Sequence, residues 1–291
     1  MSKFLGLGIA AFLIAAGTTA FADARVIYGE DDRRDLFDSR NEALMLELAR
    51  STAILVKKDD LTEADKQFNL PTETFGESQN LCKEEPFFDQ PTPGFCSGFL
   101  VGDDLFVTAG HCITDESMCA GVSMIFDYGY DHQGKDLSAV DKDDVYFCQS
   151  IVAREYAGGR GKDFAIVKLD RAVVGREALK LNRGSAINSG DGVTVIGHPS
   201  GLPTKITSGA KVRANDAAQP YFVANLDTDG GNSGSAVFNT KTGEVEGILV
   251  RGETDFVYRN SCAISNHCEE GSCRGEDVTK TSLFVQHVPA K

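Results

Sequence analysis

Short apolar runs separated by polar turns dominate the chain from Cys96 onward. Residues 99–101 and 105–108 are apolar and flank the turn Gly102-Asp103-Asp104, a pattern that predicts a β-hairpin. Similar runs bounded by Gly- or Asp-containing turns predict further strands over residues 164–169, 193–197, 235–238 and 245–250. Many short strands without long periodic helices are typical of an all-β sandwich or barrel.

The N-terminal third has a different pattern. Ser39-Arg40-Asn41-Glu42 has the spacing of a capping box and precedes a leucine-rich run, which predicts a short helix over about residues 40–49. Residues 52–56 are apolar and partly β-branched, and predict the first strand of the core. Residues 57–94 are charged and contain prolines, so we expect them to form surface loops.

The first 22 residues have the pattern of a bacterial-type signal peptide. Lys3 provides a positive start, residues 4–16 are uncharged and apolar, and Ala20-Phe21-Ala22 is a small-x-small cleavage site. The apolar run is too short for a membrane anchor. We therefore expect a secreted or periplasmic protein with a short extension over residues 23–50 and one domain over residues 51–291.

Charge and cysteine content narrow the possible partners. The formal net charge of −14 argues against binding nucleic acid or an anionic membrane through bulk charge. Eight cysteines follow the signal segment, and an even number in an exported chain favours disulfides. Cys262, Cys268 and Cys273 lie near His267, but their spacing is not that of common zinc sites. We expect no metal, no cofactor and a monomer.

The segment from Asp229 to Ser235 is the strongest sign of chemistry. It reads Asp-Gly-Gly-Asn-Ser-Gly-Ser, with glycines on both sides of Ser233. A nucleophilic serine needs an exposed hydroxyl and nearby backbone N–H groups that face the reacting carbonyl oxygen. Alone, such a segment is also compatible with an ordinary turn.

A histidine and an aspartate occur in equally specific settings. His111 stands in Thr-Ala-Gly-His-Cys at the end of the predicted hairpin, and a Cys96–Cys112 disulfide would close that hairpin at its base. Asp163 opens an apolar strand between His111 and Ser233 in the sequence. Among the remaining cysteines, we expect Cys119 to pair with Cys148 and Cys82 to pair within the C-terminal region, whose connectivity stays open.

Together these motifs resemble those of the trypsin/chymotrypsin superfamily, closest to its bacterial glutamyl endopeptidase-like branch. The resemblance covers about residues 50–252, and residues 26–33 resemble the start of that branch's mature chains. It implies a chymotrypsin-like double antiparallel β-barrel, with a boundary near residues 172–190 and a disulfide-bearing C-terminal extension. It also implies a serine endopeptidase acting on polypeptides, with His111, Asp163 and Ser233 as the triad and the N–H groups of Gly231 and Ser233 as the oxyanion hole.

The sequence alone does not decide which substrate side chain is preferred. Asp227 stands six residues before Ser233, where trypsin-like enzymes hold the acid that attracts Arg or Lys. Asp227 can equally cap a turn or pair with a cation such as Arg251, and an Arg251 inside the pocket would favour acidic substrates. Leu249 stands where the glutamyl branch has a histidine, which counts against strict glutamyl specificity. Thr228 and Gly252 are expected to line the pocket.

Asn232 marks another departure from the family pattern. Many trypsin relatives have an Asp before the serine that receives the new amino terminus after cleavage of the precursor. Because a neutral Asn cannot form that ion pair, we predict that activation does not use this switch. The rival interpretation of the chain is a protease-fold binding module without catalysis. The order His, Asp, Ser argues against an α/β-hydrolase esterase.

Overall fold

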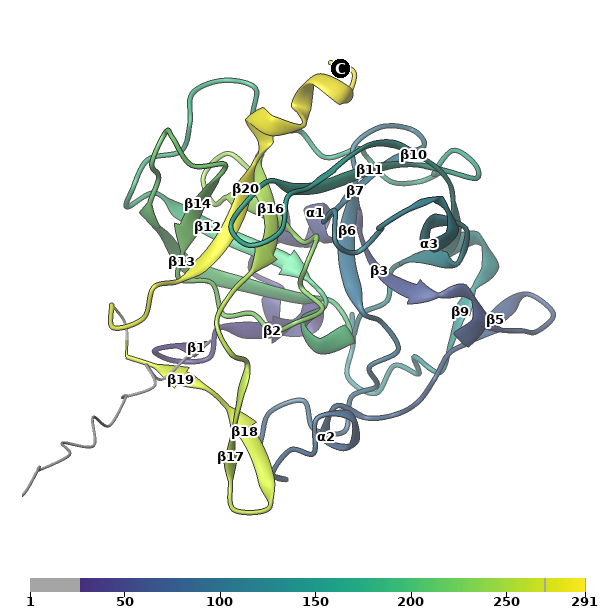
Figure 1. Cartoon of the computed structure of the whole chain (residues 1–291). Coiled ribbons are helices and arrows are strands. Elements are labelled where there is room, and N and C mark those ends of the chain that lie inside the picture. The colour runs from purple at the N-terminus through teal and green to yellow at the C-terminus, as the bar shows by residue number, and fades with distance from the viewer. Residues whose placement is uncertain (1–26, 270, 291) are drawn as a thin grey trace, which may run out of the picture.

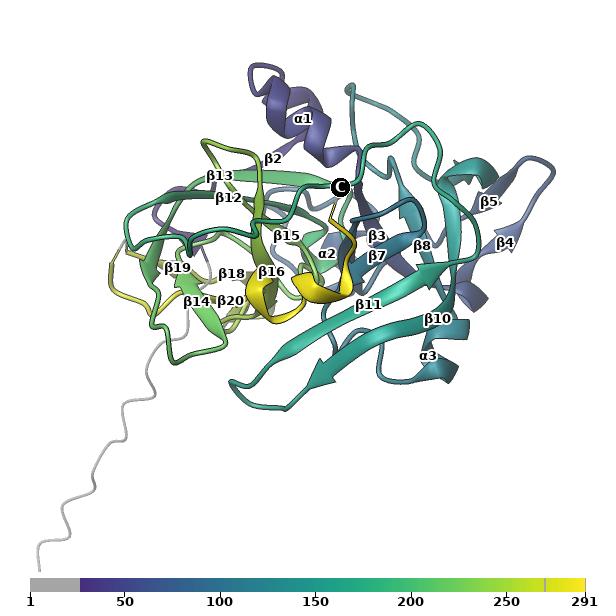
Figure 2. The ribbon, with the colours of Figure 1, turned by 90° about the horizontal axis from the view of Figure 1, so that it is seen from above.

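The computed structural model describes residues 27–269 and 271–290, so the predicted signal peptide and Val26 lie outside the described residues. Strands dominate these residues and form two six-stranded antiparallel β-barrels that lie side by side (Figure 1). Seen from above, the second barrel lies on the left and the first barrel on the right (Figure 2). The predicted all-β, chymotrypsin-like double-barrel fold is therefore confirmed.

The first barrel closes through six strands that pair in the order β10-β11-β7-β6-β3-β8. Its interior holds aromatic side chains such as Phe106 and Phe126, whose ring centroids are 6.1 Å apart in an edge-to-face pair. Every residue of β6 and of β8 is buried, so neither strand has the alternation of buried and exposed residues that marks a half-exposed strand. The six strands are β3 (Thr52–Lys57), β6 (Cys96–Leu100), β7 (Leu105–Thr108), β8 (Val122–Phe126), β10 (Val145–Tyr156) and β11 (Asp163–Leu169).

The second barrel follows in the chain and begins at Gly192, after a connector that starts beyond Leu169. Its strands pair in the order β12-β15-β16-β20-β14-β13, and pairing of β13 with β12 closes the ring. A separate apolar cluster that includes Phe222 and Leu249 fills it. The six strands are β12 (Gly192–Gly197), β13 (Lys205–Ala214), β14 (Tyr221–Ala224), β15 (Ala236–Asn239), β16 (Val245–Arg251) and β20 (Glu276–Lys280).

The N-terminal extension is built into the second barrel. Strand β2 (Arg33–Asp35) pairs antiparallel with β13, and β1 (Ile27–Tyr28) pairs in parallel with β19 (His267–Cys268). Helix α1 (Ala43–Ala49) follows a 3₁₀ turn, and the hydroxyl of Ser39 donates to the carbonyl of Asp35. The expected capping box at Ser39 is therefore wrong, because Ser39 ends the preceding turn instead of capping the helix.

The expected loop region contains several small elements. A capping box does form there, at Thr74 and Glu77 of helix α2 (Phe75–Ser78). Strands β4 (Thr62–Glu63) and β5 (Gln67–Asn69) also lie in this region. Further along the chain, helix α3 (Glu116–Ala120) packs beside β10, and the remaining short strands are β9 (Ala139–Asp141), β17 (Phe256–Arg259) and β18 (Cys262–Ser265).

The C-terminal region departs from expectation in two ways. Strand β20 is a member of the second barrel, so residues beyond 252 complete the domain rather than only extend it. The sequence pattern of residues 282–288 predicts a final strand, and this prediction is wrong, because two 3₁₀ turns, Thr281–Leu283 and Val285–His287, occupy that segment. The first turn follows β20 directly, and Phe284 and Val288, the residues that come immediately after the two turns, are buried.

All eight cysteines are paired. Cys96 pairs with Cys112 and Cys119 with Cys148, both within the first barrel. Cys82 joins Cys262, and Cys268 joins Cys273. The zinc alternative for the C-terminal cysteines is therefore excluded, because none of them retains a free thiol.

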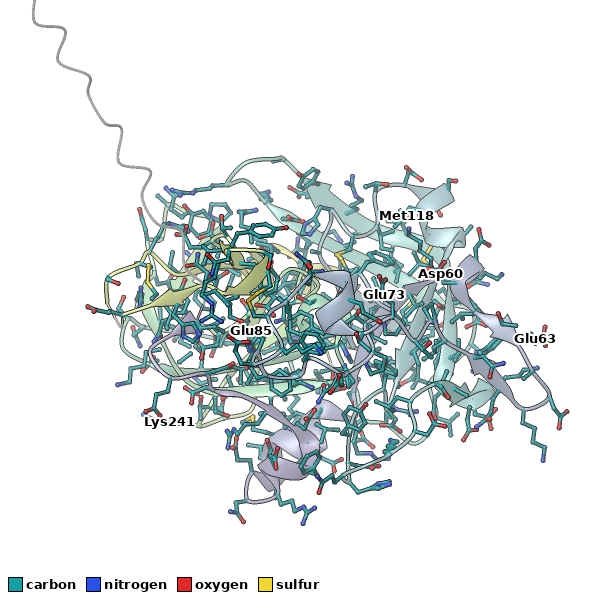
Figure 3. The ribbon with its side chains drawn as sticks, turned by 90° about the horizontal axis from the view of Figure 1, so that it is seen from below. Asp60, Glu63, Glu73, Glu85, Met118 and Lys241 are labelled. Atoms are coloured by element: carbon teal, nitrogen blue, oxygen red, sulfur yellow. A yellow bond between two sulfur atoms is a disulfide. The ribbon has the colours of Figure 1, made fainter. Side chains whose placement is uncertain are left out.

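Many of the charged side chains lie at the surface. Side chains such as Glu63 and Lys241 project outward from the ribbon (Figure 3). Within the described part of the chain, no helix has the length and apolarity needed to cross a membrane.

Candidate active site

His111 is held by a frame that is local in the sequence. Strand β7 ends at Thr108, whose hydroxyl donates to the carbonyl of Ser97 at 2.7 Å. Gly110 precedes the histidine, and a Cβ at this position would overlap the backbone of Glu155 and Phe164. The disulfide at Cys112 follows immediately. Strand pairing, a glycine contact and a covalent bond thus fix the backbone of His111.

Asp163 orients the imidazole of His111. Its Oδ2 lies 2.8 Å from His111 Nδ1, and its Oδ1 accepts a hydrogen bond from the backbone N–H of His111 at 3.1 Å. The Asp163 side chain is 2% exposed and that of His111 is 31% exposed. A buried carboxylate therefore holds one imidazole nitrogen, and the ring remains accessible for chemistry at the other.

Ser233 lies against the strand that carries Cys96. Its carbonyl accepts a hydrogen bond from the N–H of Ser97 at 2.8 Å, and it lies 3.6 Å from Cys112 Sγ. Gly234 follows with φ of +95°, and a Cβ there would overlap the carbonyl of Ser97. These contacts bring the serine from the second barrel to the residue next to His111.

The loop before Ser233 turns its carbonyl groups away from the serine. The carbonyl of Gly230 accepts from the N–H of Ser200 at 2.5 Å, and the carbonyl of Gly231 accepts from the hydroxyl of Ser97 at 2.8 Å. No backbone carbonyl of the described residues accepts a hydrogen bond from the N–H of Gly231 or Ser233. Both N–H groups are thus available to stabilise an oxyanion.

A cavity of about 130 Å³ opens beside Ser233. Thr228 and Gly252 line it, as expected from the sequence. Its other lining residues are Asp229, Gly230, Leu249, Arg251, Glu253, Asp255 and Glu276. Four carboxyl groups and one guanidinium group therefore surround this space.

Asp227 lies outside this lining. Its carboxylate accepts hydrogen bonds from the backbone N–H groups of Tyr28 and Asp32, at 2.7 and 2.9 Å. Burial raises the pKa of Asp227 to about 7, and the two N–H groups oppose that rise. The structure thus favours the interpretation of Asp227 as a residue that binds nearby backbone, here the N-terminal segment.

Arg251 reaches the cavity, but its charge is already matched. Its Nε lies 3.2 Å from Asp277 Oδ2, and its Nη2 donates to the carbonyl of Gly161 at 2.7 Å. Its Nη1 is 3.7 Å from Asp163 Oδ2. Because these groups hold the guanidinium, it is not free to receive an acidic substrate side chain.

Two acids of the cavity were missed in the sequence. Glu276 accepts a hydrogen bond from the hydroxyl of Tyr28 at 2.9 Å, and burial raises its pKa well above the ordinary value. Asp255 accepts from the N–H of Gly230 at 2.7 Å, and burial, followed by the charge of Asp229, raises its pKa to about 7. Neither belongs to a local motif, so their position depends on the closure of the second barrel.

His198 is a buried residue with a structural position. Its ring is fully buried, with Nδ1 3.0 Å from the carbonyl of Leu202. Burial lowers its pKa to about 3, so the ring is neutral at physiological pH. Among the described residues, Cys96, His111 and Cys112 are grouped closely enough to hold a metal ion, but the two sulfurs form a disulfide and the group does not fit a metal.

Comparison with known proteins identifies relatives of this fold. Residues 96–248 match the model of the trypsin-like peptidase domain family. The structure is similar to that of a Glu endopeptidase in complex with MPD, at 18% identity and a TM-score of 0.52, covering 90% of this chain and 97% of the other. A serine endoprotease from Yersinia pestis aligns at 16% identity and a TM-score of 0.49, covering 84% of this chain and 64% of the other. No match was found among curated protein sequences.

Proposed function

Because the chain belongs to the trypsin-like peptidase domain family, we propose that it is a serine endopeptidase whose triad is His111, Asp163 and Ser233. The observation that carries this proposal is the 2.8 Å contact between His111 Nδ1 and Asp163 Oδ2 beside a serine loop whose carbonyls face away from the serine. That combination provides an oriented base and free N–H donors at one place.

The mechanism follows from the roles of these groups. Ser233 Oγ attacks the carbonyl carbon of the peptide bond, and His111 takes the hydroxyl proton. The N–H groups of Gly231 and Ser233 stabilise the negative oxygen of the tetrahedral intermediate. His111 then gives the proton to the leaving amine, which leaves an acyl ester on Ser233. Water, deprotonated by His111, hydrolyses this ester, while Asp163 holds the imidazole and stabilises its cation.

The cavity beside Ser233 supports a preference for basic side chains. Glu276, Asp255 and Glu253 line it, while Arg251 and Arg33 are already paired with carboxylates. A cationic substrate side chain would pair with these carboxyl groups and favour their ionised forms, whereas an acidic one would find no unpaired cation in the lining. The alternative, acidic primary specificity, would require Arg251 to leave Asp277 and Gly161.

We also propose that the protein is exported and acts as a monomer on polypeptide substrates. Four disulfides are compatible with an oxidising compartment. The acidic surface does not favour nucleic acid or an anionic membrane as partner.

Digestion of a mixed peptide library tests the proposed function. The mature chain and its Ser233→Ala variant are incubated under oxidising conditions, and the products are identified by mass spectrometry. We expect cleavage by the wild type alone, mainly after Arg or Lys. Cleavage after Glu or Asp would refute the basic preference and keep the peptidase. No cleavage by either folded protein would favour the rival function, a binding module on the protease fold.

A further inference from the structure

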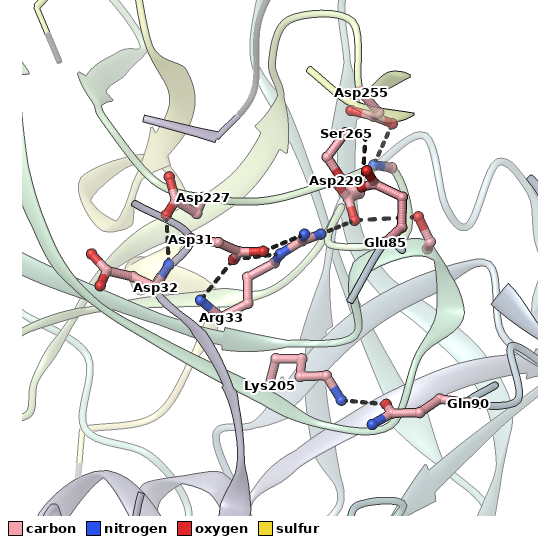
Figure 4. A network of polar contacts seen from close by, with 12 residues as sticks. Asp31, Asp32, Arg33, Glu85, Gln90, Lys205, Asp227, Asp229, Asp255 and Ser265 are labelled. Carbon is pink, nitrogen blue, oxygen red and sulfur yellow. Dashed lines mark hydrogen bonds and ion pairs between the residues drawn. The ribbon is translucent and has the colours of Figure 1, made fainter. Parts of the chain in front are cut away.

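The N-terminal segment places a buried cation under the loop that carries Ser233. Residues 27–28 are fixed by pairing with β19, and Arg33–Asp35 by pairing with β13. The backbone of the segment is also held by Asp227 through the N–H groups of Tyr28 and Asp32. Arg33 therefore has a defined position next to Asp229, the first residue of the loop (Figure 4).

The guanidinium of Arg33 binds two carboxylates. Its Nη1 lies 2.6 Å from Asp229 Oδ2, and both side chains are 0% exposed. Its Nε and Nη2 donate to the two oxygens of Asp31, at 2.9 and 2.7 Å. Burial alone lowers the pKa of Arg33, but Asp229 and Asp31 outweigh burial and raise it, so the group stays charged.

Asp229 needs this cation because its other charged neighbours are acids. Burial raises the pKa of Asp229, Arg33 opposes that rise, and Asp31 adds to it. Asp255 is also close enough to Asp229 for their charges to interact. Without Arg33, the Asp229 carboxylate would be buried among like charges, which favours protonation or a move of the loop toward solvent.

A move of Asp229 would disturb the groups that face the reaction. The carbonyl of Asp229 accepts a hydrogen bond from the N–H of Asn232 at 3.1 Å. The N–H of Gly230 donates to the Asp255 carboxylate, and the carbonyl of Gly230 accepts from the N–H of Ser200. Gly231 has φ of +87°, and a Cβ on it would come within 2.8 Å of the N–H of Gly201. The free N–H of Gly231 thus depends on a tightly packed turn that Asp229 begins.

Asn232 contributes no charge to this arrangement. Its side-chain oxygen accepts from the hydroxyl of Ser235 at 3.1 Å, and the residue is buried. The cation that neutralises the Asp229 carboxylate of the loop is therefore the side chain of Arg33 and not an amino terminus. It is present whether or not a peptide bond upstream of residue 27 has been cut.

We propose that Arg33 is a positioning residue that holds the loop 229–233 in the shape that leaves the N–H groups of Gly231 and Ser233 free. The inference rests on the proposed function, since it assigns Arg33 a role in the oxyanion hole. It predicts that the competent loop is built by folding alone and does not require a free amino terminus.

The test compares Arg33→Met with Arg33→Lys and with the control Arg34→Met. Arg34 is the neighbouring residue, and its side chain is 38% exposed and pairs with Glu42 at the surface. Amide hydrogen exchange over residues 229–235 is measured together with kcat and KM on a peptide substrate. We expect Arg33→Met to exchange faster in this segment and to lose on the order of 10² to 10³ in kcat, with KM changed only a few-fold.

The Arg33→Lys variant and the Arg34→Met control test whether the effect comes from the charge at position 33. Arg33→Lys keeps the charge but not the forked geometry, so we expect it to retain kcat within about tenfold of the wild type. Arg34→Met should match the wild type in both measurements. Unchanged exchange over residues 229–235 in a folded Arg33→Met variant would overturn the proposal. So would a loss in Arg34→Met as large as that in Arg33→Met.

A second variant covers the case in which Arg33→Met does not fold. Arg33→Met combined with Asp229→Asn removes the fully buried Asp229 carboxylate together with its cation, and the remaining partner, Asp31, has a side chain that is 21% exposed. Because residue 229 still lacks its contact with Arg33, we expect this variant to fold with faster exchange confined to residues 229–235. Exchange at the wild-type rate there would overturn the proposal. If the wild type hydrolyses no peptide, the proposed function fails, while the exchange measurements still decide the role of Arg33.

Discussion

The two barrels hold their parts of the site by different means. In the first barrel, His111 is fixed by neighbours in sequence, including a disulfide with a separation of 16 residues and the hairpin that it closes. In the second barrel, the loop before Ser233 is fixed by buried charges from distant segments, and Arg33 and Asp229 are 196 residues apart. The proposed base is positioned by local covalent and strand geometry, whereas the proposed nucleophile depends on electrostatics that exist only after the whole domain has folded.

The largest effect should come from the groups where the two barrels meet. His111→Ala removes the base, so we expect kcat to fall by on the order of 10⁴ or more, as for Ser233→Ala. Because the residues act as one unit, the double variant should be no slower than either single one. Steady-state kinetics on one peptide substrate measures all three. Additive losses would show that the two barrels contribute independently.

The local frame of the first barrel can be tested by removing its disulfide. Replacing both Cys96 and Cys112 with Ala should lower the free energy of unfolding by about 3 kcal/mol in the chain-entropy model. Chemical denaturation under oxidising conditions measures this loss. Because the disulfide adjoins His111, we also expect kcat to fall more than KM rises. Full activity at an unchanged KM would mean that strand pairing alone positions the histidine.

The charges of the second barrel can be tested through pH. The pKa of Asp255 is raised to about 7 by burial and by Asp229, so its carboxyl group ionises as the pH rises through that value. A cationic side chain binds better to the ionised form, so KM for an Arg substrate should fall by up to about tenfold between pH 6 and 8. Kinetics across this range measures the change.

Two controls separate Asp255 from other titrating groups. A substrate with citrulline in place of Arg has the same shape without the charge, and its KM should stay level over the same range. Asp255→Asn should flatten the profile for the Arg substrate. An equal pH dependence for both substrates would show that the cavity does not recognise charge through Asp255.

The smallest effect concerns the amino terminus. Chains that begin at Asp23 and at Val26 should have kcat values within a few-fold of each other, because Arg33 supplies the buried cation in both. Parallel kinetics of the two proteins measures this. A gain on the order of a thousand-fold on starting at Val26, about 4 kcal/mol of barrier, would show that a free terminus orders the loop.

The same contrast explains which features could be predicted from the sequence. Strands β11, β12, β15 and β16 were found within one or two residues because they are buried apolar runs. The strands β10, β13 and β20 were missed, since polar and charged residues fill much of each. Strand β20 contains Glu276 and Asp277, both buried, and no local pattern distinguishes it from a charged loop.

The candidate site also contains residues that local motifs identify and residues that only the folded structure brings into place. The residues proposed as the triad lie in short motifs that sequence spacing can detect, and the structure gives His111 and Asp163 a direct contact. The offset of Asp227 from Ser233 leaves open whether it lies at the base of the pocket or binds nearby groups, and in the structure its carboxyl group accepts hydrogen bonds from the backbone of the N-terminal segment. Glu276 and Arg33 reach their positions through strand pairings between distant segments, and Asp255 lies in the loop before β17, so local motifs cannot identify any of the three.

The proposed function depends on Ser233 being a nucleophile that His111 activates. The most direct measurement is labelling of the folded mature protein with a fluorophosphonate, followed by peptide mapping by mass spectrometry. We predict a single adduct on Ser233 that is absent in His111→Ala and in Ser233→Ala. An adduct on another residue, or equal labelling of Ser233 in His111→Ala, would contradict the account.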